Sequence, residues 1–308
     1  MKHRTRALVP ALVPLAILGL VASLLVSREE HHPPRADAPR HACARLSRPF
    51  TGAVVASPQS RSLAKLAAFG IRPDVVESYA AFGKPFNAGQ ADPAEAVHAV
   101  PVIQIDPREV SVAAIASGHK NAYLRTYAKS VRAFGCPIVL SFGHEMNGNW
   151  YSWGWHHVKP ATFIAAWRDI VTVFRSEHVS NVTWMWTPNR YVPGTSRIGP
   201  PSQWWPGGAY VNWVGIDAYY SSASETFGTL LDETLSAIQK LTSDPVVIAE
   251  TGVWPGSGQA SNIGALFNGA EAAGMSGIIY FDLPGREAWQ LASSSALVAF
   301  SNAVRSFG

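Results

Sequence analysis

The chain has 308 residues, and a composition of 47% hydrophobic and 15% charged residues excludes an intrinsically disordered protein. Residues 1–48 hold eight lysines and arginines against three acids, a charge of +5, so the formal net charge of +4 leaves the remaining residues at −1. A nearly neutral body lacks the basic face that phosphate binding requires, and we therefore expect no nucleic-acid partner.

The N-terminus has the composition of a targeting segment. Three basic residues precede an apolar run from Ala7 to Val26, which is as long as a membrane span or a long signal peptide. We predict that residues 1–26 are a signal peptide or a membrane anchor, and that the rest is secreted or anchored facing outside. This segment is the only contact with a membrane that we expect. Residues 27–48, rich in Arg, His and Pro, are predicted to form a flexible stem.

Apolar runs then alternate with helical patterns to the end of the chain. We predict strands at residues 50–57, 74–82, 100–106, 137–145, 181–187, 211–219, 245–250 and 277–282. We predict helices at residues 60–69, 93–98, 121–134, 160–177, 227–241, 262–273 and 294–305. The fifth strand is followed instead by a loop rich in Trp, Pro and Gly.

Strands that are apolar on both faces indicate a parallel sheet covered by helices. Eight β/α units in about 250 residues match the size of a closed barrel. We therefore predict an α/β fold, a single-domain (β/α)8 TIM barrel over residues 49–308. A doubly wound open sheet is the alternative, and it is weakened because SPQSRS, not a glycine-rich phosphate loop, follows the first strand.

Two glutamates end apolar runs 105 residues apart, Glu145 in CPIVLSFGHEMNGNW and Glu250 in PVVIAETGVW. Burying an unpaired carboxylate is costly, so this placement indicates a site. The carboxyl ends of barrel strands meet at one mouth, and the fourth and seventh strands lie on opposite sides of it. Two facing carboxylates are the minimum equipment for hydrolysing a glycosidic bond. Other polar residues at predicted strand ends are Tyr79, Asp106, His144, Asn189, Asp217, Tyr219 and Asp282.

The chain has two cysteines, Cys43 and Cys136. One precedes the first predicted strand and the other begins the fourth, so both lie at the same end of a barrel. Outside the cytoplasm they form either one disulfide or two separate thiols. His144-Glu145 begins like a zinc-protease helix, but Gly148 stands where the second histidine would be. We expect no metal and no cofactor.

Five passages, GHEMNGNWYSWGW, WTPN, YVNWVGIDAYY, VVIAETG and IIYFDLPGREAW, together resemble glycoside hydrolase family 26, whose founding members are endo-β-1,4-mannanases. The resemblance covers roughly residues 50–308, with the motifs in family order. It implies a (β/α)8 fold and a retaining mechanism. It places Glu145 as the general acid/base and Glu250 as the nucleophile.

The resemblance also implies substrate-binding residues around these two glutamates. They are His144 and Tyr219 beside the nucleophile or its sugar, Trp150 and Trp289 flanking the cleaved sugar, and Asp217 two residues before the tyrosine. Asn189, at the end of the fifth strand, is a further candidate for binding hydroxyls or holding its neighbours in place. Tyr219 and Tyr220 point opposite ways, and we assign the mouth to Tyr219. The passages VVESYAAFGKPF and QIDP diverge from the family pattern, which leaves the distal sugar subsites open.

The roles of the two glutamates determine the protonation state that we expect for each. Tyr219 and a nearby histidine would favour the charged form of Glu250, while the Glu250 charge and the wall of Trp150 would raise the pKa of Glu145. We expect a monomeric retaining endo-β-glycosidase that hydrolyses a β-linked polysaccharide, first of all β-1,4-mannan. A mixed-linkage β-1,3-1,4-glucanase is the alternative, because members of this family differ in that choice. A non-catalytic carbohydrate-binding protein is the alternative from another class.

Overall fold

A computed structural model describes residues 43–47, 49–54, 61–86, 89, 91–283, 289–291 and 293–308. Residues Ala42–Gly308 form one compact unit. The predicted targeting segment, residues 1–26, lies outside the described residues, as does most of the predicted stem. None of the helices described is both long and apolar enough to cross a membrane.

Eight parallel strands close into a barrel, each paired with its neighbour in the sequence. They are β1 (Phe50–Val54), β2 (Val75–Ala81), β3 (Val100–Asp106), β4 (Ile138–Phe142), β5 (Val182–Trp186), β6 (Trp213–Asp217), β7 (Val246–Thr251) and β8 (Gly277–Phe281). β8 pairs with β1, with Phe50 opposite Gly277, and this pairing closes the ring. The predicted barrel is confirmed.

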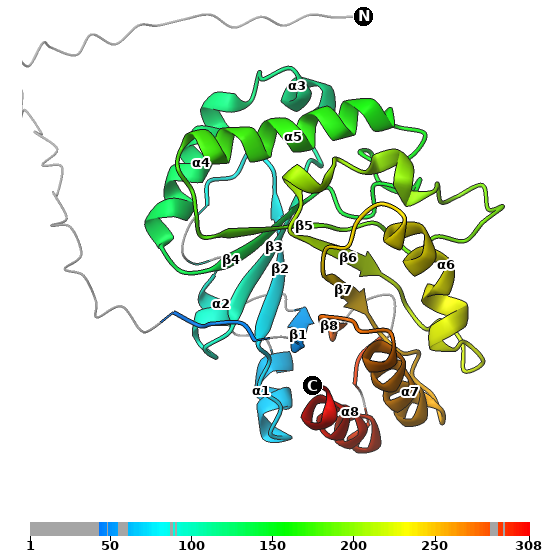
Figure 1. Cartoon of the computed structure of the whole chain (residues 1–308). Coiled ribbons are helices and arrows are strands. Elements are labelled where there is room, and N and C mark those ends of the chain that lie inside the picture. Colours follow the sequence, from blue (N-terminus) through cyan, green and yellow to red (C-terminus); the bar gives the residue numbers. More distant parts are fainter. Residues whose placement is uncertain are drawn as a thin grey trace, which may run out of the picture. The chain divides into compact units, whose positions relative to one another are not determined.

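The helices lie around the outside of the strands (Figure 1). They are α1 (Arg61–Ala68), α2 (Asp92–Glu95), α3 (Val112–Ala116), α4 (Asn121–Phe134), α5 (Pro160–Ser176), α6 (Phe227–Gln239), α7 (Gln259–Ala272) and α8 (Ser294–Ser306). The predicted loop between β5 and β6 contains two short 3-10 turns, Pro201–Trp204 and Gly208–Tyr210. The sequence did not predict α3, because its five residues are too few to show a helical period.

Side-chain alternation along the strands separates two apolar layers. The layer inside the barrel includes Val75, Val102, Val139, Val247 and Ile279. The layer between strands and helices includes Ile103, Leu140, Ile216, Ile248 and Ile278. Because both faces of the sheet are buried, the strands have the continuous apolar sequences that predicted a parallel sheet.

The strand boundaries differ from the prediction most clearly at β4, which was expected to run to Glu145. It ends at Phe142, because Gly143 has φ +56°, a left-handed conformation that breaks the strand and that glycine adopts readily. Glu145 therefore lies in the turn after the strand. β6 is also shorter than predicted at both ends, and the last predicted residues of the first strand lie outside the described part of the chain.

A disulfide joins Cys43 to Cys136. It links the described part of the predicted stem, residues 43–47, to the segment between α4 and β4. Leu46 in this segment packs against the apolar layer inside the barrel. The segment is thus held at the end of the barrel where the strands begin.

We expect Cys136→Ser to lower the free energy of unfolding by about 3–4 kcal/mol, because the bridge closes a loop with a sequence separation of 93 residues. Urea denaturation with and without dithiothreitol measures this. Reduction should destabilise the native protein by the same amount and leave the variant unchanged. Equal sensitivity of both proteins to the reductant would contradict a stabilising bridge.

Candidate active site

The carboxyl ends of the strands surround a pocket of about 290 Å³. Both glutamates singled out from the sequence line it, although one follows β4 and the other belongs to β7. The remaining lining residues are Tyr79, Arg108, His144, Tyr151, Tyr219, Phe281 and Trp289. The fold therefore brings the two carboxyl groups into one cavity.

Glu250 faces the pocket because β7 is irregular at this point. Ile248 packs toward the helices and Ala249 toward the barrel interior, so strict alternation would turn Glu250 outward. However, Ile216 pairs with Ile248 while the next residue, Asp217, pairs with Glu250. Ala249 is the extra residue of a bulge, a feature that re-aims side chains beside functional sites.

Two phenols donate hydrogen bonds to the Glu250 carboxylate. The hydroxyl of Tyr79 donates to Oε1 at 2.5 Å, and that of Tyr219 donates to Oε2 at 2.7 Å. Burial raises the pKa of both tyrosines well above their usual value, so they remain donors at neutral pH. The two donors fix the orientation of the carboxylate and leave it placed toward the pocket.

Glu145 lies in a strained turn, with φ +53°. A positive φ is uncommon for glutamate, and such strain is concentrated at functional sites. Its backbone N–H donates to the carbonyl of Thr187 at 2.7 Å. The next residues anchor the turn, because Met146 is buried in the core and the Asn147 side chain donates to the carbonyl of Asn189 at 2.9 Å. The surrounding structure thus offsets the cost of the strain.

The Glu145 carboxyl group is held by two further donors. Trp150 donates its indole N–H to Oε2, and Asn189 donates its amide to Oε1, both at 2.5 Å. Burial raises the pKa of Glu145 to about 7. The cation on His144 and these hydrogen bonds lower that pKa, whereas the charge of Glu250 raises it. At neutral pH this group is poised between its protonated and ionised forms.

His144 is buried beside Asp106 at the end of β3. Its Nδ1 lies 2.8 Å from Asp106 Oδ1, and its Nε2 lies 3.3 Å from the hydroxyl of Tyr151. Burial alone would lower the pKa of His144, but the hydrogen bond and charge of Asp106 raise it to about 9, assisted by Glu250 and Glu145. The ring is therefore a cation at neutral pH and partly balances the surrounding carboxylates.

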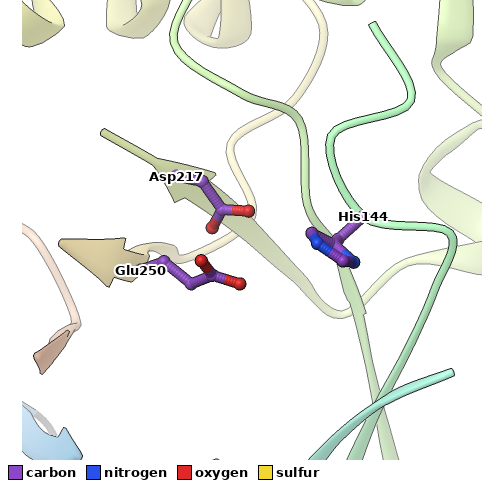
Figure 2. Close-up of side chains that lie close together, drawn as sticks. All are labelled: His144, Asp217 and Glu250. Carbon is purple, nitrogen blue, oxygen red and sulfur yellow. The ribbon is translucent and has the colours of Figure 1, made fainter. Parts of the chain in front are cut away.

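Asp217 completes this group of ionisable side chains. Figure 2 shows its carboxylate, that of Glu250 and the ring of His144 turned toward one another. Ligating atoms of these three lie within 4.8 Å of one another, a spacing close to that of a metal site. A metal would have to displace the proton of His144, because only a neutral imidazole coordinates. We therefore interpret the group as a histidine cation among carboxyl groups.

A fifth carboxyl group, Glu77, lies beneath these residues and was not predicted. It is fully buried on β2, two residues before Tyr79 and so on the same face of the strand. Burial and the charge of Glu250 raise its pKa well above the usual value, as they do for Asp217. Burial thus favours the protonated form of both groups. The spacing of Glu77 and Tyr79 in VVESYAAF was the signal that could have identified it.

The two tryptophans assigned to the site depart in part from the sequence prediction, which expected Trp150 to raise the pKa of Glu145. Trp150 is 37% exposed beside Glu145, but its hydrogen bond lowers the Glu145 pKa instead of raising it. Trp289 lines the pocket and is only 6% exposed, with its ring 4.9 Å from that of Tyr219. Tyr220 is buried away from the pocket, so the choice of Tyr219 agrees with the structure.

The other polar residues at strand ends divide between the site and the scaffold. Asn189 binds Glu145 and Asp106 binds His144, which places both in the site. Asp282 instead forms an ion pair with Lys65 at 2.7 Å and accepts the backbone N–H of Leu291 at 3.0 Å. It connects the last strand to α1 and the segment before α8.

A parallel (β/α)8 barrel with two glutamates in one pocket at the carboxyl ends of its strands has the architecture of a retaining or inverting glycoside hydrolase. The family model described as glycosyl hydrolase family 26 matches residues 113–267, half of the chain. The chain belongs to glycosyl hydrolase family 26.

Three relatives carry different names. Endoglucanase H of Acetivibrio thermocellus is 34% identical over 161 residues, 48% of this chain and 17% of that protein. Mannan endo-1,4-beta-mannosidase A and B of Caldalkalibacillus mannanilyticus is 31% identical over 93 residues, 28% of this chain and 17% of that protein. Beta-1,3-xylanase of a Vibrio species is 26% identical over 106 residues, 34% of this chain and 22% of that protein. The chain matches only about a fifth of the length of these curated relatives.

Among solved structures, the catalytic domain of the endo-beta-1,4-mannanase from Bacillus sp. JAMB-750 superposes with a TM-score of 0.64. The superposition covers 84% of this chain and 86% of that domain, at 17% sequence identity. At this identity the likeness shows the (β/α)8 fold.

Proposed function

We propose that the protein is a retaining endo-β-glycosidase with Glu250 as nucleophile and Glu145 as general acid/base. One observation carries the proposal: the two carboxyl groups share a pocket but have different surroundings. Glu250 accepts two phenol hydrogen bonds, whereas burial raises the pKa of Glu145 to about 7. Groups whose environments separate their protonation states are suited to opposite roles in acid–base catalysis.

The first step joins the sugar to the protein. The Glu250 carboxylate attacks the anomeric carbon and the glycosidic carbon–oxygen bond breaks, while Glu145 transfers its proton to the departing oxygen. The product is a glycosyl ester on Glu250, which carries no charge. Because the charge of Glu250 raises the pKa of Glu145, that pKa falls when the ester forms.

The second step releases the sugar. Water attacks the anomeric carbon, Glu145 accepts its proton, and Glu250 leaves as a carboxylate. Two inversions at the same carbon retain its configuration. The phenols of Tyr79 and Tyr219 stabilise the returning charge, and each is a rigid donor that needs no rearrangement.

For the substrate, we propose β-1,4-mannan first and mixed-linkage β-glucan second. The names of one relative and of the solved structure, a mannan endo-1,4-beta-mannosidase and an endo-beta-1,4-mannanase, support mannan. The most identical of the three relatives described above is named an endoglucanase, which supports the glucan alternative. Because one of the three relatives is named a β-1,3-xylanase, xylan must also be tested as a substrate.

Reducing-end release from purified mannan, lichenan and β-1,3-xylan tests the proposal, with proton NMR to follow the anomer formed first. We expect rapid release from one polysaccharide, internal cleavage and a β-configured product. An α-configured first product would overturn the retaining mechanism. Calorimetric binding of an oligosaccharide without any hydrolysis would instead establish the non-catalytic alternative.

We expect kcat/KM to fall tenfold per unit of pH above about pH 7. The general acid must be protonated, and Glu145 loses its proton as the pH passes its pKa. Trp150→Phe removes a hydrogen bond that lowers this pKa, so the fall should begin at higher pH. A pH–rate profile of both proteins measures this, and identical alkaline limbs would argue against Glu145 as the acid.

We further propose that the protein is exported and acts as a monomer. The basic and apolar composition of residues 1–26 supports export. The disulfide between Cys43 and Cys136 supports it independently, because such bonds persist in oxidising compartments.

A further inference from the structure

Among the residues that the structure describes, three large hydrophobic side chains are exposed: Trp150 at 37%, Trp254 at 50% and Val298 at 49%. Trp150 contacts Glu145 and belongs to the site above. Trp254, in the loop between β7 and α7, has no role in the site or in the core. A single exposed apolar side chain is ordinary on a protein surface, so the case for a ligand rests on the aromatic rings that Trp254 packs against.

A row of aromatic rings connects Trp254 to the nucleophile. The Trp254 ring lies 5.8 Å from that of Trp289 at an angle of 81°. Trp289 in turn lies 4.9 Å from Tyr219, whose hydroxyl donates to Glu250. Tyr219 and Trp289 line the pocket, and Trp254 is the next ring outward.

Glycine allows the inner part of this row to pack closely. A Cβ on Gly252 would lie 2.6 Å from Cβ of Trp289 and 3.3 Å from Cδ1 of Tyr219. A larger residue here would push the rings apart. The absence of a side chain at Gly252 thus allows Trp289 to pack against Tyr219, and Trp254 packs on Trp289 in turn.

The backbone that carries Trp254 is also fixed. Its own N–H donates to the carbonyl of Tyr220 at 2.9 Å. The preceding residue, Val253, is buried, receives a hydrogen bond to its carbonyl from Gln259 and donates its N–H to the hydroxyl of Tyr280. An exposed aromatic ring on a rigid backbone binds a ligand at little cost in conformational entropy.

We propose that Trp254 is a sugar-binding platform outside the catalytic pocket, for a pyranose ring of the β-glycan on the non-reducing side of the cleaved bond. The sugar that Glu250 attacks would occupy the pocket, and the departing oxygen must lie within reach of the acid Glu145, whose carboxyl group contacts Trp150. Trp254 extends from the nucleophile side, so it meets the chain beyond the attacked sugar. The C–H face of a pyranose packs on an indole as other flat apolar surfaces do. This inference rests on the proposed function.

Calorimetry in an inactive Glu145→Gln background tests the platform. The ligands are oligosaccharides of three to six units from whichever polysaccharide the protein cleaves or binds. We expect Trp254→Ala to weaken binding of the longer oligosaccharides about tenfold and to leave the shortest one that binds unchanged. Trp254→Phe should recover part of the loss. Val298→Ala, which removes a similarly exposed apolar side chain on α8, is the matched control and should change nothing.

Steady-state kinetics distinguish sugar binding by Trp254 from a role of Trp254 in supporting the pocket. In the otherwise unchanged enzyme, Trp254→Ala should raise KM for the polysaccharide about tenfold and leave kcat within twofold. Equal affinity of Trp254→Ala and its parent across all lengths would overturn the inference, as would an equal loss at every length or a large fall in kcat. If the Glu145→Gln parent binds none of the oligosaccharides, the proposed function itself fails and the platform fails with it.

Discussion

Replacing Glu250 with alanine is expected to lower kcat on the polysaccharide by roughly 10⁵-fold or more, because no other group in the pocket is held to attack the anomeric carbon. The cavity that the shorter side chain leaves can admit azide. Azide would attack from the same side as the lost carboxylate and would displace the leaving group once. The expected product is therefore an α-glycosyl azide, which NMR identifies when an aryl β-glycoside is the substrate.

Glu77→Gln is the matched control for this variant. It also removes a buried carboxyl group near the barrel axis, but one that does not line the pocket and whose pKa is raised by burial, so the neutral amide resembles its protonated form. Its kcat should fall less than a hundredfold. If Glu77→Gln were as inactive as Glu250→Ala, or if azide gave a β-configured product with Glu250→Ala, the assignment of the nucleophile would be wrong.

Replacing Glu145 with alanine is expected to lower turnover of the polysaccharide by about 10²–10⁴-fold, the usual contribution of a general acid. The loss should depend on the leaving group. A dinitrophenolate departs without protonation, so the first step on a dinitrophenyl β-glycoside remains fast while the second step, which needs a base, becomes slow. A burst of dinitrophenol followed by a slow steady state is the expected time course.

Azide distinguishes the two glutamates. With Glu145→Ala it would attack the glycosyl ester on Glu250, so the product is a β-glycosyl azide and turnover rises. The same anion thus gives opposite anomers with the two variants. Absence of a burst with the dinitrophenyl substrate, together with no effect of azide, would reject Glu145 as the acid/base.

The protonation of the whole pocket decides whether these roles are possible. Four other buried carboxyl groups lie close to Glu250 and His144, and they cannot all be charged at once. They are Glu77, Asp106, Glu145 and Asp217. Burial raises the pKa of Glu77 and Asp217 and so favours their neutral forms, whereas Asp106 raises the pKa of His144 to about 9 and keeps it a cation. This leaves Glu145 to exchange its proton near neutral pH as the charge on Glu250 appears and disappears.

Much of this structure could be predicted from the sequence by itself. The apolar strands predicted the number and order of the β/α units, because a parallel strand buried on both faces has a continuous apolar sequence. Glu145 and Glu250 stood out because a carboxylate at the end of such a strand is expensive unless it has a function. These signals are local, and they do not depend on which strands are neighbours.

Other features were decided only when the barrel closed. Tyr79 donates to Glu250 across 171 residues of sequence, and Cys43 pairs with Cys136, because closure and strand register bring them together. The bulge at Ala249 turns Glu250 inward against the simple alternation of the strand. Trp150 donates a hydrogen bond to Glu145, which lies in the turn that begins at Gly143. Each depends on backbone geometry and on contacts between distant segments, which local composition does not encode.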